Sequence, residues 1–169
     1  MHTEPRLTGD AYYMELARTA ARRSRDPTTR VGAVVVKDDN VLGTGYNGFP
    51  PGIPDEPELL ADRRTKLTYT VHAEINAMAR AGGRPACLGA TIYVSSLWPC
   101  TNCALVLLAH GIARVVYEQP TAERAVRWAD DLRDVRILLG IAGVELVEFS
   151  KSNFLVVPVD TTVVRGGGL

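Results

Sequence analysis

The chain has 169 residues, of which 46% are hydrophobic and 22% charged, and its 19 basic and 19 acidic side chains leave no formal net charge. This size and hydrophobic content predict a single globular domain over 1–169, with a core at about 8–150 and a C-terminal extension at 151–169. The balanced charge argues against a nucleic-acid partner. No run approaches the ~20 apolar residues of a membrane span, and the first residues lack an apolar signal sequence. The three cysteines are too few for a disulfide scaffold. We therefore expect a cytoplasmic protein without a membrane segment.

The first half of the chain predicts one helix followed by a β-hairpin. The helix, over about 9–24, begins after a cap at Thr8 and ends before Pro27, because a residue that precedes proline is pushed out of the α region. Strands are expected at 31–36 and 41–46, joined by a turn at 38–40. The first of these strands is an unbroken apolar run, which predicts a sheet covered by helices on both faces.

A long connection follows, over residues 47–70, and it contains four prolines and two glycines. A connection of this length in a compact domain is usually a binding loop or a lid. Its central part, 56–66, has the charge spacing of a short helix.

The second half of the chain alternates helices with strands. A helix is expected at 71–81, ended by Gly82 and Gly83. A second is expected at 100–109, and because it is apolar nearly all round, it should be buried. A third is expected at 121–139, capped by Thr121 and stopped at Gly140 and Gly143. Strands are expected at 91–95, 114–117 and 144–149, with one more at 154–159. This alternation predicts a three-layer α/β/α domain around a mixed five-stranded sheet.

Four side chains in two short motifs have the chemistry of a catalytic metal site. His72-Ala73-Glu74 offers an imidazole and a carboxylate, and Pro99-Cys100-Thr101-Asn102-Cys103 offers two thiols at i and i+3, on one face of a helix. One His and two Cys are three protein ligands, the number at which a catalytic zinc ion keeps its fourth position for water. Glu74 is then left to act on that water.

The competing reading is a structural zinc site, because a C-x-x-C motif by itself also occurs in zinc knuckles and redox proteins. A structural site needs four protein ligands, and the remaining candidates, Cys87, His2 and His110, do not stand at paired spacing. The two motifs together therefore favour catalysis. Cys87 carries no assigned role and fits a small buried apolar residue.

With these motifs, H-x-E followed by P-C-x-x-C, the chain resembles the cytidine and deoxycytidylate deaminase superfamily, and within it the deoxycytidylate (dCMP) branch. The resemblance covers about residues 10–150. It includes the segment SRDPTTRVGA at 24–33 and the segment GYNGFP at 45–50. It implies the cytidine-deaminase-like fold, one Zn²⁺ per chain, and hydrolysis of dCMP to dUMP and ammonia.

The resemblance also implies substrate contacts. Asn47 would bind the sugar, the backbone N–H of Ala73 would bind the pyrimidine carbonyl, and Val31 belongs to the same expected contact set. Members of the branch are usually homo-oligomers, from dimers to hexamers, and some are regulated by dCTP or dTTP with Mg²⁺ near the GYNG loop.

The chain departs from the branch in three places. Trp98 stands in an approach to the P-C-x-x-C helix that is one residue longer than usual, where it would alter the base pocket. Residues 118–121 lack the tyrosine-containing segment that often follows this strand, and the loop 48–70 has no Cys or His for a second zinc.

Phosphate recognition is the least defined part of the prediction. Arg25 and Arg30, with Thr28 and Thr29 between them, stand before the first strand where a loop would present donors to a phosphate, although the same residues also suit an ordinary turn. The alternatives to a dCMP deaminase are a deaminase of another nucleotide, a nucleoside or a modified cytosine, a tRNA- or DNA-editing deaminase, and a catalytically silent zinc-stabilised binding module.

Overall fold

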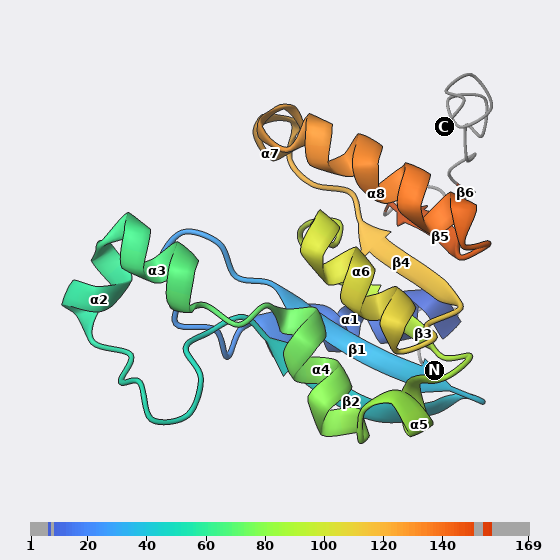
Figure 1. Cartoon of the computed structure of the whole chain (residues 1–169), viewed down its shortest axis with the longest axis horizontal. Coiled ribbons are helices and arrows are strands. Elements are labelled where there is room, and N and C mark those ends of the chain that lie inside the picture. The colour runs from blue at the N-terminus through green and yellow to red at the C-terminus, as the bar shows by residue number, and fades with distance from the viewer. Residues whose placement is uncertain (1–6, 8, 151–153, 157–169) are drawn as a thin grey trace, which may run out of the picture.

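The structure is a computed structural model that describes residues 7, 9–150 and 154–156 (Figure 1). The strands are β1 (Gly32–Lys37), β2 (Asn40–Tyr46), β3 (Thr91–Val94), β4 (Arg114–Glu118), β5 (Glu145–Phe149) and β6 (Phe154–Val156). The helices are α1 (Gly9–Ala21), α2 (Pro57–Ala61), α3 (Arg63–Tyr69), α4 (Ala73–Ala81), α5 (Arg84–Cys87), α6 (Thr101–Ala109), α7 (Ala122–Arg127) and α8 (Ala129–Ile141). The predicted cap at Thr8, the end of the last predicted strand and most of the predicted C-terminal extension lie outside the described residues.

The strands form one mixed sheet in the order β2-β1-β3-β4-β5-β6. β3, β4 and β5 run parallel, whereas β1 pairs antiparallel with both β2 and β3. The predicted α/β/α fold with a mixed sheet is thus confirmed. The described part of the sheet has six strands instead of five, because the short β6 pairs antiparallel with the edge strand β5.

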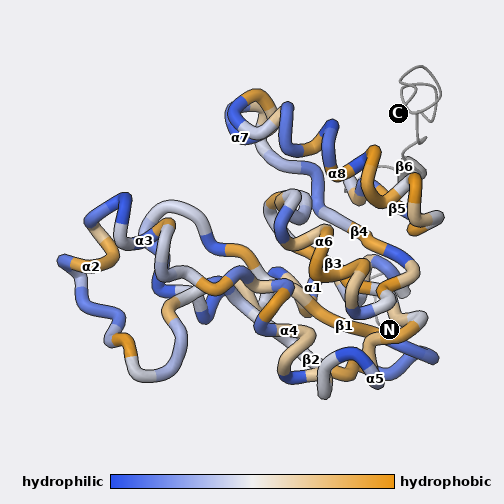
Figure 2. Tube along the Cα trace, in the orientation of Figure 1, coloured by the Kyte–Doolittle hydropathy of each residue, from blue (hydrophilic) through white to orange (hydrophobic). Residues whose placement is uncertain are grey.

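Two apolar layers sandwich the sheet, as the unbroken apolar run of β1 predicted. Ala33 and Val35 face a large core made with α4, α6 and α8, while Val34 and Val36 face a smaller core made with α1. Figure 2 shows the result as a band of hydrophobic residues along the central strands, with hydrophilic residues toward the outer ends of α2 and α7. None of the helices in the described part of the chain has the length and apolarity needed to cross a bilayer.

Glycines in β2 bring helix α4 unusually close to the sheet. A Cβ atom at Gly45 would lie 2.2 Å from the carbonyl oxygen of Ala73, and one at Gly43 would lie 2.4 Å from that of Ala77. Such a contact is possible only without a side chain, so the glycines determine where α4 rests. Because His72 immediately precedes this helix, they also determine where His72 lies.

Two helix predictions need correction. The helix expected over 121–139 is broken into α7 and α8 at Trp128, whose φ of −115° and ψ of 20° lie outside the helical region. Gly140 does not stop α8, which continues to Ile141 and ends before Gly143, where φ is +71°. A glycine costs only about 1 kcal/mol inside a helix, so a helix that is packed on a sheet continues through it.

Two further predictions were partly wrong. α6 is not buried all round, because Leu105 is 49% exposed on the side turned away from the sheet, while Ala104 and Leu107 fill the core. The helix predicted over 71–81 begins only at Ala73, so His72 precedes its first turn. It is the N-cap residue of α4, in an extended conformation.

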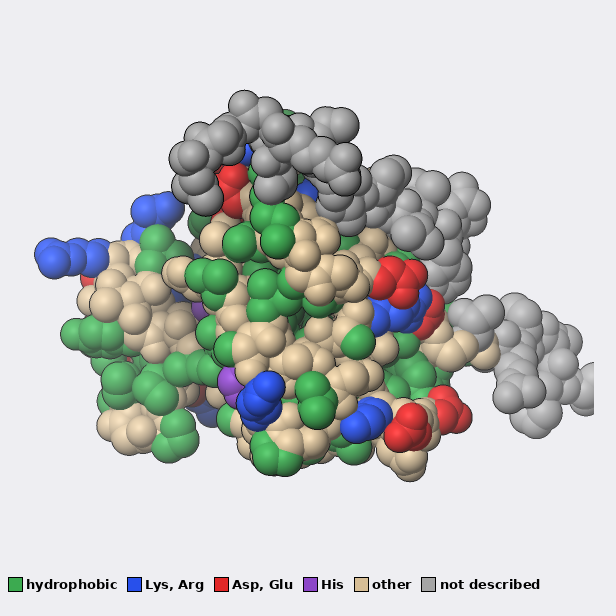
Figure 3. Space-filling view, turned by 45° about the vertical axis from the view of Figure 1, so that its right-hand side comes forward, with side chains coloured by type: hydrophobic (Ala, Val, Ile, Leu, Met, Phe, Trp, Pro, Cys, Tyr) green, Lys and Arg blue, Asp and Glu red, His purple; other side chains and the backbone are tan. Residues whose placement is uncertain are grey.

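Residues 48–70, including α2 and α3, form a lobe that projects from the domain (Figure 1). An antiparallel bridge between Gly48 and Val71 closes its base. The lobe contains the expected short helix, but Asp62 divides it into α2 and α3 by capping α3 through a hydrogen bond from the Thr65 N–H. Figure 3 shows hydrophobic side chains beside Lys and Arg side chains on this projecting part, at the left of that view.

Candidate metal centre

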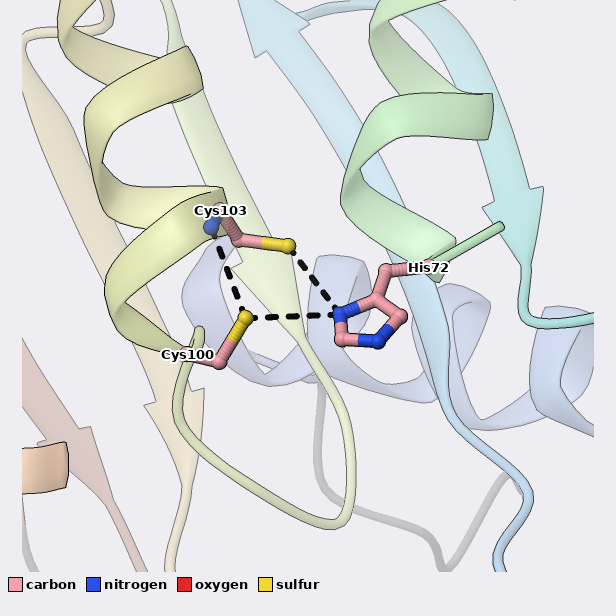
Figure 4. Close-up of side chains that lie close together, drawn as sticks. All are labelled: His72, Cys100 and Cys103. Carbon is pink, nitrogen blue, oxygen red and sulfur yellow. Dashed lines mark hydrogen bonds between the residues drawn. The ribbon is translucent and has the colours of Figure 1, made fainter. Parts of the chain in front are cut away.

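The two sequence motifs meet where the N-terminal ends of α4 and α6 lie side by side (Figure 4). His72 is the N-cap of α4, and Cys100 is the N-cap of α6, which follows the carboxyl end of β3. The N-terminus of a helix carries a partial positive charge, so two such ends favour thiolates and other anions between them. This arrangement follows directly from the order of the strands and from the close packing of α4 on β2.

Figure 4 shows the side chains of His72, Cys100 and Cys103 pointing toward one common centre. The Nδ1 atom of His72 lies 3.2 Å from the sulfur of Cys103 and 3.5 Å from the sulfur of Cys100. The three ligand atoms all lie within 4.8 Å of one another.

These separations fit a zinc ion. Zinc bound to imidazole nitrogen at ~2.1 Å and to thiolate sulfur at ~2.3 Å would hold tetrahedral ligands about 3.6 Å apart. The donor set of one nitrogen and two sulfurs is also one that zinc prefers. Among the described residues no other group of this kind is found.

Only one of the three ligands, Cys100, has a pKa shift that favours metal binding, because zinc binds thiolates and neutral imidazole. Hydrogen bonds to its sulfur, first from Cys103 and then from His72, lower the pKa of Cys100 to about 4. The same bond to Cys100 raises the pKa of His72 to about 9, with smaller contributions from nearby carboxylates that include Asp131. The pKa of Cys103 is raised, because its thiol is hydrogen-bonded to Cys100 and buried. One sulfur is therefore already disposed to be the thiolate that zinc requires.

Glu74 is buried beside these ligands, with only 3% of its surface exposed. Burial raises the pKa of its carboxyl group, because a charged carboxylate is poorly solvated there, although the charge of His72 opposes this effect. A carboxyl group whose pKa lies closer to neutrality exchanges protons more readily at physiological pH, which suits a general acid and base.

Three of the predicted substrate contacts lie together near this centre. The buried side chain of Asn47 accepts a hydrogen bond from the N–H of Val31 at 2.8 Å and donates one to the carbonyl of Thr29 at 2.9 Å. Ala73 is fully buried at the first position of α4, where a backbone N–H has no partner within its own helix. Asn47 thus joins the GYNG loop to the segment that precedes β1.

The two predicted phosphate-binding arginines are exposed, and the groups with which they interact among the described residues are not zinc ligands. Arg30 donates to the carbonyl of Asp26 at 3.4 Å, and Arg25 lies 3.6 Å from the carboxylate of Asp55 in the lobe. Arg25 also lines a cavity of about 400 Å³ whose wall contains no zinc ligand. The lining residues are Arg23, Arg25, Tyr46, Asn47, Gly48, Phe49 and Asp55.

Trp98 is only 3% exposed, and its ring packs edge-on against Tyr117 in the core at 6.1 Å. Its indole N–H is buried and has no hydrogen-bond partner among the described residues. The side chain of Trp98 therefore points into the core from the segment that precedes α6. It would affect the base pocket indirectly, by packing beneath the backbone that leads to Cys100.

Most of the polar contacts around these motifs could not be predicted from the sequence. Lys66 of the lobe forms a buried ion pair with Asp26 at 3.0 Å, and Asp26 also accepts hydrogen bonds from Thr28 and Thr29. Glu118 and Asp131 hold backbone N–H groups on either side of Cys100. Most of these contacts join residues that are distant in sequence. The exception is the turn at Asp26, because an Asp two residues before a Thr is a local sign of an Asx turn.

Comparison with known proteins places the zinc motifs in a defined family. Residues 7–119 match the family model described as the cytidine and deoxycytidylate deaminase zinc-binding region. The chain is 34% identical to the deoxycytidylate deaminase of Homo sapiens over 146 residues, which are 82% of this chain and 78% of the human protein. It is 40% identical to the deoxycytidylate deaminase of Mycobacterium phage D29 over 120 residues, 64% of this chain and 92% of the phage protein.

A solved structure shows the same architecture. The dCMP deaminase of the cyanophage S-TIM5, in complex with dCMP and dUMP, superimposes with a TM-score of 0.65 at 26% identity. The match covers 88% of this chain and 100% of the phage chain. The common fold therefore extends beyond the zinc motifs to nearly the whole of the described domain.

Proposed function

Because the chain belongs to the cytidine and deoxycytidylate deaminase family, we propose that it hydrolyses dCMP to dUMP and ammonia with one zinc ion per chain. Family membership confirms the resemblance that the two motifs predicted. The single observation that carries the proposal is the convergence of His72, Cys100 and Cys103 on one centre beside the buried carboxyl group of Glu74.

His72, Cys100 and Cys103 would hold the zinc ion. When bound, zinc supplies Lewis-acid chemistry that makes water a competent nucleophile near neutral pH. The three protein ligands come from the ends of two packed helices, so the domain holds them in place without a separate metal-binding loop. Catalytic zinc sites in general have three protein ligands, whereas structural sites have four.

Glu74 would move the protons. Its carboxylate takes a proton from the attacking water and delivers it to N3 of the cytosine ring as the oxygen adds to C4. It then carries the second proton to the departing amine, which leaves as ammonia. Burial raises the pKa of Glu74, which favours the protonated form that acts as the acid in the second half of the reaction.

Asn47 and Ala73 would orient the substrate, the first at the sugar and the second through its backbone N–H at the pyrimidine carbonyl. Val31 would complete this contact set, because the hydrogen bond from its N–H fixes the Asn47 side chain. Arg25 and Arg30 would supply charge to the 5′-phosphate, and Trp98 would act on the base pocket through the loop before Cys100. The exposure of both arginines leaves their guanidinium groups able to turn toward a ligand.

We also propose that the protein is a cytoplasmic homo-oligomer, between a dimer and a hexamer, without a nucleic-acid partner. All three cysteines are unpaired, as expected in a reducing compartment. Regulation by dCTP or dTTP with Mg²⁺ would use the cavity beside Tyr46, where Arg23 offers positive charge to a polyphosphate.

A substrate panel tests the proposal. Ammonia release is measured from dCMP, CMP, deoxycytidine, cytidine and an RNA hairpin, with the purified zinc protein at equal substrate concentrations. The proposal expects the highest kcat/KM for dCMP. Preference for a nucleoside, for CMP or for the hairpin would replace dCMP by that substrate, and no release from any of them, with one zinc bound, would favour a silent binding module.

A further inference from the structure

The loop that leads to Cys100 has a strained backbone, which is stabilised by side chains from other elements. Ser96 has a φ of +71°, in the left-handed region that non-glycine residues rarely adopt. Its N–H donates to the carboxylate of Glu118, at the end of β4, at 2.9 Å. Glu118 is itself held by Arg18 of α1, whose Nε lies 2.8 Å from the other carboxylate oxygen. A conformation of this kind persists only where surrounding contacts impose it.

The first residue after Cys100 is also held by a carboxylate. The backbone N–H of Thr101 donates to Asp131 of α8 at 3.0 Å, and the hydroxyl of Thr101 donates to the same oxygen. Thr101 is the first residue of α6, whose N-terminal N–H groups have no partner in their own helix. The third of them, on Cys103, turns to the sulfur of Cys100 at 3.4 Å.

Cys100 therefore lies between two carboxylates that come from different elements. Glu118 fixes the backbone four residues before it, and Asp131 fixes the backbone one residue after it. Neither carboxylate contacts a zinc-ligand atom in the hydrogen bonds of the described residues. The break of the helix at Trp128 starts α8 afresh at Ala129, which places Asp131 in the first turn of α8.

We propose that Glu118 and Asp131 are positioning residues that hold Cys100 and Cys103 at the spacing zinc requires. The proposal rests on the proposed function, because it takes His72, Cys100 and Cys103 as the zinc ligands. Groups that orient metal ligands through hydrogen bonds typically change metal affinity 10–100-fold when they are removed. Their role differs from that of Glu74, which acts on the reacting atoms.

Asp131 offers the sharper experiment because the chain supplies a matched control. Asp130, its neighbour on α8, has a side chain that is 97% exposed and only a weak ion pair with Arg133 at 3.9 Å. Asp131→Ala, Asp131→Asn and Asp130→Ala are prepared as full-length zinc proteins. Zinc affinity is measured by competition with a chromophoric chelator, and the thiolate-to-metal absorption bands are recorded after exchange of zinc for Co²⁺.

Asp131→Ala is expected to weaken zinc binding at least tenfold and to shift the cobalt bands, because the loop is no longer fixed. Asp131→Asn keeps an acceptor oxygen and should recover most of the affinity, and Asp130→Ala should match the wild type. Glu118→Ala should give a similar loss, whereas Arg18→Gln, which leaves the Ser96–Glu118 bond in place, should change the affinity less. Circular dichroism of each zinc-loaded variant verifies that it is folded.

Several results would overturn the proposal. Folded Asp131→Ala and Glu118→Ala that bind zinc within twofold of the wild type, with unchanged cobalt bands, would show that neither carboxylate positions the ligands. If Asp131→Ala does not fold, Asp131→Asn provides the test. A tenfold loss of zinc affinity in this variant, which keeps an acceptor oxygen, would assign the effect to the charge of Asp131 and would also contradict the proposal. A wild-type protein that fails to bind zinc at all would instead contradict the proposed function, which separates the two failures.

Discussion

The zinc centre and the projecting lobe at 48–70 are built in opposite ways. The zinc centre takes its ligands from two short motifs at helix N-termini. The i, i+3 spacing of Cys100 and Cys103 and the packing of α4 on Gly43 and Gly45 restrict where the ligand side chains can lie. The lobe is attached through the bridge at its base and through long-range polar contacts, chiefly the ion pair between Lys66 and Asp26. A change in the centre should therefore affect chemistry, and a change at the lobe should affect stability and substrate access.

The largest expected effect lies in the zinc centre. Glu74→Gln removes the group that moves protons but keeps a side chain of the same shape. Activity toward dCMP should fall at least ~10²–10⁴-fold, the usual contribution of a positioned acid and base. Metal analysis should still find one zinc per chain. A Glu74→Gln protein with full activity would show that another group moves the protons.

The second test concerns the attachment of the lobe. Lys66→Met should lower the free energy of unfolding by about 3 kcal/mol, the lower end of the cost of breaking a buried ion pair, because Asp26 keeps its bonds from Thr28 and Thr29. Urea unfolding measures the change, with the exposed Arg63→Met on the same helix as the control. The variant should retain its zinc. Loss of zinc together with stability would mean that the two regions are not separate.

A smaller effect is expected at the substrate phosphate. Arg30→Ala and Arg25→Ala should each raise the KM for dCMP about tenfold, because a charge-assisted hydrogen bond contributes about 1.5 kcal/mol. The KM for deoxycytidine, which has no phosphate, should stay unchanged in steady-state assays. Equal increases for both substrates would assign these arginines to the fold of the segment instead of to phosphate binding.

The smallest effect is a dependence of the lobe's attachment on pH. Burial by itself would raise the pKa of Asp26, but hydrogen bonds from Thr29 and Thr28 and from Lys66 lower it below its ordinary 3.8. A lowered pKa means that Asp26 stabilises the fold above the pKa of the unfolded chain and that this contribution is lost as the pH falls through the folded pKa.

The matched comparison is wild type against Asp26→Asn, with unfolding measured from about pH 6 to about pH 3. The wild type should be the more stable at the upper end, and the difference should shrink toward the acid end. Loss of zinc in acid affects both proteins and cancels in the difference. A difference that does not vary with pH would show that Asp26 acts without its charge.

The sequence predicted the features that depend on local patterns, and it did not predict those that depend on long-range contacts. The α/β/α sheet, its hairpin and the four residues of the centre were accessible because periodicity and i, i+3 spacing act over a few residues. Glu118, Asp131 and the partner of Lys66 were not, because their contacts join residues far apart along the chain. The exposed face of α6 at Leu105 and the break at Trp128 were also missed, since tertiary packing decided both.

The most direct measurement is a zinc titration of chelator-treated protein, with bound metal and ammonia release from dCMP recorded in the same samples. Both quantities should rise together and reach their maximum at one zinc per chain, while the His72→Ala protein should bind no zinc at that affinity and release no ammonia. Metal-free protein that is fully active, or a His72→Ala protein that binds zinc as tightly as the wild type, would contradict the zinc centre described here.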